Sequence, residues 1–268
     1  MENIKQIVKI LKRLKFPAKP TKKQLLLYKE AVYKTCVLQK QPEVLILGAT
    51  PELRDLCIKH NCKVTAVSPG KIALEAMTYM MEHKDHPNNK AIESNWTNIP
   101  LPNNSCDLAL TDMALTCNPI KKHDPILKEV QRILKPSGFF FIRSYDMLEH
   151  ESKLDPDELL KQWRTREIVT EDFIYLSPRI SLDENNNISQ AKNLEIFKQF
   201  CQEKKLTKKE IAILIPYKSK GTMSCPYRKD LIKTFSKYFK NITVKCAKDP
   251  KIKTIEQDAL FFMQVKKF

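Results

Sequence analysis

The stretch EVLILGATPELRDL, residues 43–56, has the residue types of a ligand-binding loop between a strand and a helix. Gly48 ends an apolar run, and Thr50-Pro51-Glu52 is typical of a helix start, with Thr50 as the N-cap. Helix N-termini at such loops often bind pyrophosphate. Here Pro51 removes one N–H donor and Glu52 adds a negative charge, so a ligand with an ammonium group suits the loop better. The missing GxGxxG pattern also argues against a nicotinamide dehydrogenase.

Polar residues end two later apolar runs as well. Asp112 follows one run, and Arg143, Tyr145 and Asp146 follow the next. Because the carboxyl ends of parallel strands form one edge of a sheet, these side chains are expected beside the same pocket. We take Asp112 as a functional candidate and the other three as candidates for substrate contact. The alternatives are a surface acid at Asp112 and an ion pair with a structural acid at Arg143.

The elements that must position these residues alternate along the chain. Continuous apolar runs, each followed by a helical pattern, predict a mostly parallel sheet covered by helices on both faces. Two late strands without a helix between them predict an antiparallel pair added to that sheet. Strands are expected at 44–47, 63–67, 90–94, 107–111, 139–143, 242–246 and 259–266, helices at 2–15, from Thr21 onward, and at 51–60, 70–83, 124–134 and 226–239, and a turn at 135–138.

Four regions follow from this pattern. We expect N-terminal helices at 1–40, a ligand-binding core at 41–149, a helical insertion at 150–222, and a closing helix with two strands of the core at 223–268. Lysines surround the apolar positions of the first helix, which either packs on its own domain or lies on a membrane surface.

The net charge of +16 leaves nucleic acid open as a partner, although a general lysine bias gives the same profile, since 39 of the 47 basic residues are Lys. No apolar stretch reaches the roughly 18–20 residues of a membrane span, and no signal peptide is recognisable. We therefore expect a soluble cytoplasmic protein. The eight cysteines are scattered without metal-ligand spacing, and we predict that they are reduced and that no metal is bound.

Four segments together resemble a known family. They are VLILGATPEL, VTAVSPGKIALEAM, NWTNIPLPNNSCDLALTDMAL and ILKEVQRILKPSGFFFIR. In order and spacing they are similar to the successive motifs of class I S-adenosylmethionine-dependent methyltransferases, and the first resembles a small bacterial branch with a G-x-T-P-E-L motif. The resemblance covers roughly residues 40–145. It implies a seven-stranded Rossmann-like sheet and an insertion after the fifth strand that covers the substrate as a lid.

The resemblance also implies a function and a set of site residues. The function is in-line transfer of a methyl group to an unidentified acceptor, a small molecule rather than a macromolecule. The family usually has an acid that binds the ribose where this chain has Ser68, and often an Asp where it has Asn95. These departures keep an inactive methyltransferase-like scaffold open as an alternative, and the charge keeps an RNA-binding or RNA-modifying protein open. The expected cofactor-binding residues are Gly48, Ala49, Thr50, Glu52, Ser68, Asn95, Trp96 and Asp112.

Overall fold

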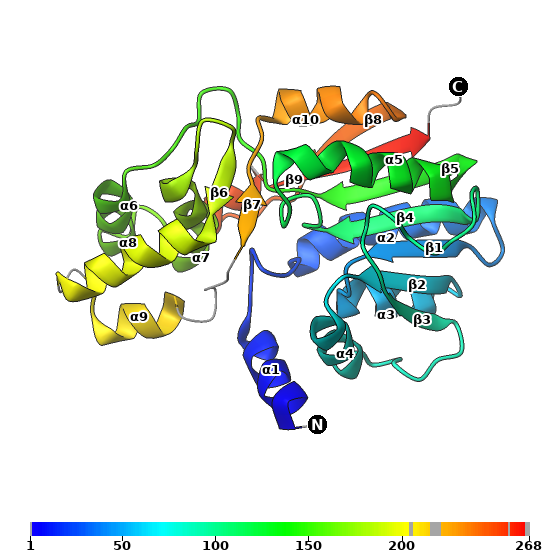
Figure 1. The fold of residues 1–268 in the computed structure, drawn as a ribbon, viewed down its shortest axis with the longest axis horizontal. Helices are drawn as coiled ribbons and strands as arrows, with labels where there is room; N and C mark the ends of the chain where they lie inside the picture. Colours follow the sequence, from blue (N-terminus) through cyan, green and yellow to red (C-terminus); the bar gives the residue numbers. More distant parts are fainter. Residues whose placement is uncertain (1, 204–205, 215–220, 257, 266–268) are drawn as a thin grey trace.

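The computed structural model describes residues 2–203, 206–214, 221–256 and 258–265, and its centre is a seven-stranded sheet (Figure 1). The strand order is β3-β2-β1-β4-β5-β9-β8. The first five strands in the chain pair in parallel, and β9 pairs antiparallel with both β5 and β8, which confirms the predicted sheet. The strands are β1 (Glu43–Leu47), β2 (Lys63–Ser68), β3 (Asn89–Glu93), β4 (Cys106–Asp112), β5 (Leu134–Arg143), β8 (Phe239–Cys246) and β9 (Ala259–Val265).

Helices cover both faces of this sheet because alternate strand residues point to opposite sides. Val44 and Ile46 of β1 pack in one cluster with α2 (Lys22–Leu38), α3 (Pro51–Lys59) and α4 (Lys71–Tyr79). Leu45 and Leu47 pack in a second cluster with α5 (His123–Ile133) and α10 (Arg228–Phe235). Burial on both sides explains why the strands are continuously apolar.

Of the two N-terminal helices, α2 covers one face of the sheet. Helix α1 (Glu2–Arg13) contacts α4, which agrees with packing on its own domain. Helix α2 begins with the predicted capping box: Thr21 Oγ1 accepts from the Gln24 backbone N–H, and Gln24 Oε1 accepts from the Thr21 backbone N–H. None of the described helices is long and apolar enough to cross a membrane.

The insertion is built mainly of short helices with an apolar cluster of their own. Figure 1 shows them gathered at one end of the sheet. A small two-stranded sheet, β6 with β7, was not predicted, because strands of three residues are too short to show a hydrophobic period. The elements are α6 (Pro156–Arg164), α7 (Thr170–Leu176), η2 (Ser177–Ser181), β6 (Asn187–Ser189), α8 (Gln190–Gln202), α9 (Lys208–Leu214) and β7 (Thr222–Ser224). The short 3-10 turns η1 (Ile120–Lys122) and η4 (Lys253–Glu256) lie outside it.

The prediction of a turn at 135–138 was wrong. The structure includes these residues in β5, where Leu134 pairs with Cys106 and Phe139 pairs with Leu108. One residue of β4 thus lies opposite four residues of β5, which is a local irregularity rather than a break between elements. A Cβ atom on Gly138 would lie 2.9 Å from the Lys135 carbonyl oxygen, so only glycine fits there.

Two predicted helices were too long. Helix α4 ends at Tyr79 and not at residue 83, because the chain turns there and the backbone N–H groups of Glu82 and His83 donate to the Asp55 carboxylate. Helix α10 ends at Phe235, and Phe239 already begins β8. Side-chain and sheet contacts from distant segments set both ends.

His123 joins the start of α5 to the insertion and carries a prediction about pH. Its Nε2 lies 2.9 Å from Ser224 Oγ and 3.1 Å from the Leu115 carbonyl oxygen, and burial lowers the pKa of its imidazole. A lowered pKa means that the folded state binds fewer protons than the unfolded state. The free energy of unfolding should therefore fall as the pH drops below about 6.5, the ordinary histidine pKa.

The test compares urea unfolding of the wild type and His123→Gln between about pH 5 and 8, where histidine titrates. Because all other titrating groups are shared, the difference between the two profiles isolates His123. We expect a steeper acid-side loss in the wild type, limited to about 1.4 kcal/mol per pH unit for one proton. Parallel profiles would show that His123 does not titrate as its burial requires.

Candidate functional site

A cavity of about 450 Å³ lies where three parallel strands end and the insertion begins. Strands β1, β2 and β4 end at Leu47, Ser68 and Asp112, and all three residues line it. Because β2 and β4 lie on opposite sides of β1, this is the crevice where open α/β sheets bind ligands. The described lining residues are Leu14, Pro17, Ala18, Leu47, Gly48, Ala49, Thr50, Ser68, Ala73, Met77, Trp96, Asp112, Met113, Ala114, Cys117, Ile174, Ser177, Pro178, Gln190, Asn193, Leu194, Phe197 and Met223.

The loop after β1 forms one wall of this cavity. Gly48 has a φ of +107°, and its N–H donates to the Val67 carbonyl oxygen at 2.8 Å. Nothing lies within 4 Å of a Cβ built on Gly48, so the space beside it is open. Thr50 is the N-cap residue of α3, as predicted, but its side chain makes no capping hydrogen bond. Glu52 is in the first turn of α3 and is not among the lining residues.

The loops after β2 and β3 form a second wall. Ser68 is buried at the end of β2, and its Oγ lies 3.5 Å from the Gly70 backbone nitrogen. The Trp96 indole lines the cavity and donates from Nε1 to the Val67 carbonyl oxygen at 2.7 Å. Asn95 is exposed and does not line the cavity, because its Oδ1 accepts from the backbone N–H and the hydroxyl of Thr97.

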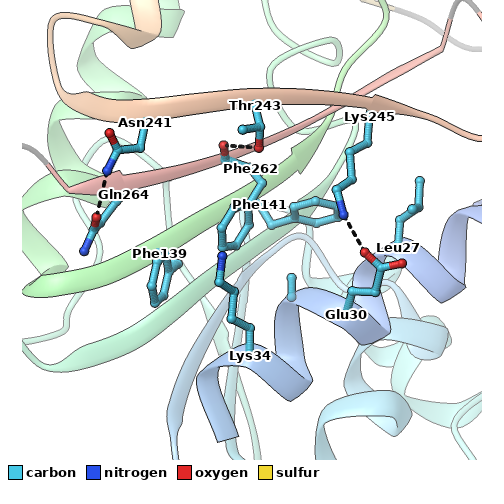
Figure 2. A pocket seen from close by; sticks show the side chains of 11 residues that line it. Leu27, Glu30, Lys34, Phe139, Phe141, Asn241, Thr243, Lys245, Phe262 and Gln264 are labelled. Atoms are coloured by element: carbon cyan, nitrogen blue, oxygen red, sulfur yellow. Dashed lines mark hydrogen bonds and ion pairs between the residues drawn. The ribbon is translucent and has the colours of Figure 1, made fainter. Parts of the chain in front are cut away.

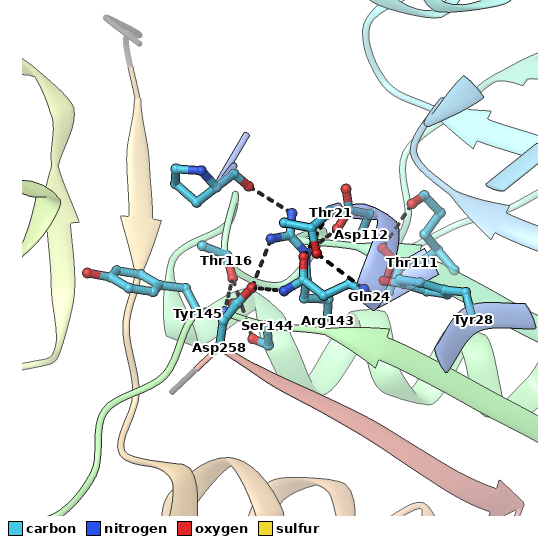
Figure 3. A network of polar contacts seen from close by, with 12 residues as sticks. Thr21, Gln24, Tyr28, Thr111, Asp112, Thr116, Arg143, Ser144, Tyr145 and Asp258 are labelled. Atoms are coloured by element: carbon cyan, nitrogen blue, oxygen red, sulfur yellow. Dashed lines mark hydrogen bonds and ion pairs between the residues drawn. The ribbon is translucent and has the colours of Figure 1, made fainter. Parts of the chain in front are cut away.

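Arg143 lies behind the cavity in a buried ion-pair network (Figure 3). Its Nε donates to Asp112 Oδ1 at 2.5 Å, its Nη1 to Asp258 Oδ2 at 2.9 Å, and its Nη2 to the Pro17 carbonyl oxygen at 2.8 Å. Gln24 also donates to Asp258, at 2.6 Å. Desolvation raises the pKa of Asp258, and Arg143 acts against that rise. The structure thus gives Arg143 the structural role considered as its alternative.

Tyr145 and Asp146 are also buried away from the cavity lining. The Tyr145 hydroxyl donates to the Tyr175 carbonyl oxygen at 2.8 Å. Arg228 Nε donates to Asp146 at 2.6 Å, and desolvation raises the pKa of Asp146 to about 7 against the opposing effect of Arg228. With Arg143, both residues join the sheet edge to other elements, and none of the three is placed to contact a ligand in this cavity.

Sequence reasoning missed the side of the cavity that faces away from the sheet. It consists of residues from the segment after α1 and from α7, η2, α8 and β7, which carry no recognisable motif. Positions 190, 193, 194 and 197 have helical spacing, but this signal points to the cavity only when the place of α8 in the fold is known. Cys117 also lines the cavity, and it is exposed.

A second hollow lies on the face of the sheet between α2 and the strands β8 and β9 (Figure 2). Its floor is aromatic, with Lys34 Nζ 4.7 Å from the centre of the Phe262 ring. An ion pair between Lys245 and Glu30 spans it. Because none of its described lining residues comes from the loops at the carboxyl edge, this hollow is separate from the candidate site.

The comparisons with known proteins agree with this geometry. Residues 48–142 match a family model described as a methyltransferase domain. A search of curated proteins finds no match. Many solved structures share the fold. Three of them are a Pyrococcus horikoshii protein (14% identity, 91% and 92% of the two chains covered, TM-score 0.54), a Rhodobacter sphaeroides protein described as a zinc-dependent alcohol dehydrogenase (12%, 93% and 92%, 0.58), and the 1,6-didemethyltoxoflavin-N1-methyltransferase of Burkholderia thailandensis with bound 1,6-didemethyltoxoflavin and S-adenosylhomocysteine (10%, 90% and 77%, 0.50).

At these identities the solved structures show the fold alone. The family match adds a similarity in sequence to a methyltransferase domain, limited to residues 48–142. The matched residues run from Gly48, in the loop after β1, to Ile142, next to the end of β5. They include the strand ends and loops that form the sheet side of the cavity. The chain therefore has the Rossmann-like fold of class I methyltransferases, and its residues 48–142 are similar to a methyltransferase domain.

Proposed function

We propose that this protein transfers a methyl group from S-adenosylmethionine to a small acceptor bound under the insertion. The cavity at the ends of β1, β2 and β4 is the observation that carries this proposal, because the residues matching the methyltransferase family form its sheet side. Its volume of about 450 Å³ is within the range of roughly 300–1,000 Å³ that small-molecule sites show. The small bacterial branch indicated by the G-x-T-P-E-L motif remains part of the proposal.

The residues present fit this cofactor. The open space beside Gly48 admits a ligand close to the backbone, Trp96 offers an aromatic wall, and Ser68 offers a hydroxyl. Glu52 remains a candidate for a longer-range effect on an ammonium group, and Asn95 would reach the cofactor only after breaking its bonds to Thr97. When bound, S-adenosylmethionine supplies an electrophilic methyl group on its sulfonium.

The protein's own part in the reaction is orientation and exclusion of water. The insertion supplies the walls opposite the sheet, as expected of a lid over the acceptor. Among the described lining residues, Asp112 is the one carboxylate, and its pair with Arg143 keeps it from serving as a free base. The site therefore suits a nucleophile that has its lone pair available without prior loss of a proton.

Ser68→Asp tests the assignment of the ribose side of the cavity. The resemblance implies a carboxylate at this position, which would accept two charge-assisted hydrogen bonds where the hydroxyl makes one. We expect S-adenosylhomocysteine to bind about 10- to 100-fold more tightly to the variant, measured by isothermal titration calorimetry. Ser236→Asp, on an exposed serine after α10 that does not line the cavity, is the control for added charge and should leave the affinity unchanged.

Equal or weaker binding to Ser68→Asp would contradict the assignment. If the protein is an inactive scaffold, neither the wild type nor the variant should bind S-adenosylmethionine or S-adenosylhomocysteine. If the protein binds RNA through its overall lysine charge, it should retain RNA of any sequence and release it as the salt concentration increases. No lysine or arginine occurs among the described residues that line the cavity, so any such charge acts elsewhere on the surface.

A further inference from the structure

Helix α2 has apolar residues on two opposite faces. Its inner face packs on the sheet and contains the buried residues Gln24, Tyr28, Ala31, Val32 and Thr35. Leu26, Tyr33 and Val37 have a spacing that places them together on the side that faces away from the sheet. Their exposed fractions are 61%, 61% and 68%. Because the helices of a domain surface usually have one apolar face, the second face indicates a contact with a partner.

Contacts on the inner face fix the orientation of α2. The Tyr28 hydroxyl donates to the Thr111 carbonyl oxygen at 2.8 Å, and Gln24 Nε2 donates to Asp258 Oδ2 at 2.6 Å. The Tyr28 ring also packs edge-on against Phe141, with 4.8 Å between the ring centres. Rotation of α2 to bury its outer apolar residues would break both hydrogen bonds and leave buried polar groups unpaired. The outer residues therefore stay exposed until a partner covers them.

Lysines border the outer apolar residues. Around the helix, Lys22 and Lys29 lie on one side of them and Lys34 on the other, and all three lysines are exposed. We call Leu26, Tyr33 and Val37 with these three lysines the α2 outer face. Glu30 is the only acidic residue of α2, and it pairs with Lys245 (Figure 2). The α2 outer face thus combines an apolar stripe with a positive border.

This combination distinguishes between classes of partner. A nucleic acid would pair with the lysines but leave the apolar stripe in water. A second copy of the chain would cover the stripe, but it would bring two lysine borders together in a chain whose net charge is +16. An anionic membrane surface accommodates both parts, because apolar side chains enter the boundary between head groups and acyl chains while lysines stay among the head groups.

We propose that the α2 outer face binds the surface of an anionic lipid membrane. Leu26, Tyr33 and Val37 enter the interfacial region, where a tyrosine ring can be buried while its hydroxyl stays in contact with water. The sheet lies on the other side of α2, so the domain remains outside the bilayer. None of the residues of the α2 outer face is among the described residues that line the cavity, so this binding does not depend on the proposed function.

The test measures binding of the full-length protein to vesicles by co-sedimentation. One set of vesicles contains phosphatidylcholine alone, and the other contains phosphatidylcholine with anionic phosphatidylglycerol. We expect about 10-fold or tighter binding to the anionic vesicles, with a loss of affinity as the salt concentration increases. Equal binding to both sets, or no binding to either, overturns the proposal.

Matched substitutions locate the apolar part of the contact. Val37→Gln should weaken binding to anionic vesicles about 5- to 20-fold, because it removes an apolar side chain from the interface. Val244→Gln makes the same change at a valine that is 38% exposed on β8, and it should keep wild-type binding. Val244 pairs with Phe261, whose side chain packs with α10 on the opposite face of the sheet from α2. Thermal unfolding checks that both variants are folded.

A second matched pair tests the charged part. Lys29→Gln should weaken binding about 5-fold, the effect of roughly one lysine near an anionic surface. Lys128→Gln lowers the net charge equally on an exposed residue of α5, which packs on the opposite face of the sheet, and should have little effect. Equal losses in both lysine variants with no loss in Val37→Gln would mean attraction by overall charge and overturn the proposal. A dimer in solution that Val37→Gln dissociates, without vesicle binding by the wild type, would assign the face to a second copy and also overturn it.

Discussion

Replacing Arg143 by methionine is expected to lower the free energy of unfolding by about 3–5 kcal/mol, the usual cost of removing one partner from a buried ion pair. Arg143 is fully buried, and the change would leave the carboxylates of Asp112 and Asp258 without their common cation. It would also release the Pro17 carbonyl oxygen, which joins the N-terminal segment to the sheet. The melting temperature should fall by on the order of 10 °C.

Two further variants make this result specific. Arg143→Lys keeps the charge but loses the planar fork that reaches three acceptors, so an intermediate loss is expected. Lys59→Met breaks an exposed ion pair with Glu82 and should change stability little. Chemical unfolding of all three variants measures the differences. A loss below about 1 kcal/mol in Arg143→Met, as for a surface pair, would mean that the network does not stabilise the sheet edge.

Gly48→Val is expected to weaken S-adenosylhomocysteine binding by about 10- to 100-fold, because the new side chain would occupy space beside the loop that the proposed ligand needs. The backbone strain of a valine at this position, on the order of 1–3 kcal/mol, should lower the stability of the protein instead. The φ of +107° at Gly48 is outside the range that branched side chains adopt, and the new side chain would extend into the open space of the cavity. Isothermal titration calorimetry measures the affinity, and thermal unfolding measures the accompanying strain.

Gly221→Val is the matched control. Gly221 has a φ of +128° and is equally open around its Cβ position, but it does not line the cavity. The backbone strain should therefore be similar, while S-adenosylhomocysteine affinity should remain near that of the wild type. Equal loss of affinity in both variants would show that strain alone, and not the position of Gly48 beside the ligand, explains the effect.

The sheet was predictable from sequence because its strands are buried on both faces and bounded by clear helix starts such as Thr50-Pro51-Glu52. The small β6–β7 sheet was not, because three-residue strands have no period. The segment 135–138 was misread for a different reason: Pro136 and Gly138 are turn residues, but the pairing of Leu134 with Cys106 keeps them inside β5. That pairing depends on tertiary contacts that no local pattern shows.

The same difference between local patterns and tertiary contacts explains which site residues could be predicted. The predicted residues that line the cavity, such as Gly48, Ser68 and Trp96, follow strand ends that the sequence located. Arg143 also follows a strand end, but Asp258, 115 residues further along the chain, faces it and gives it a structural role. Asn193 and the other lining residues of α8 lie on a helix without any motif, so their place at the cavity could be found only from the fold.

The central claim is that the cavity at the ends of β1, β2 and β4 holds S-adenosylmethionine. Its most direct test is a calorimetric titration of the wild-type protein with S-adenosylhomocysteine, with Gly48→Val and Gly221→Val titrated alongside. The account predicts one binding site per chain, weakened in Gly48→Val and preserved in Gly221→Val. No binding to the wild type at about 1 mM ligand, the weakest affinity that such a titration is meant to detect here, would contradict it.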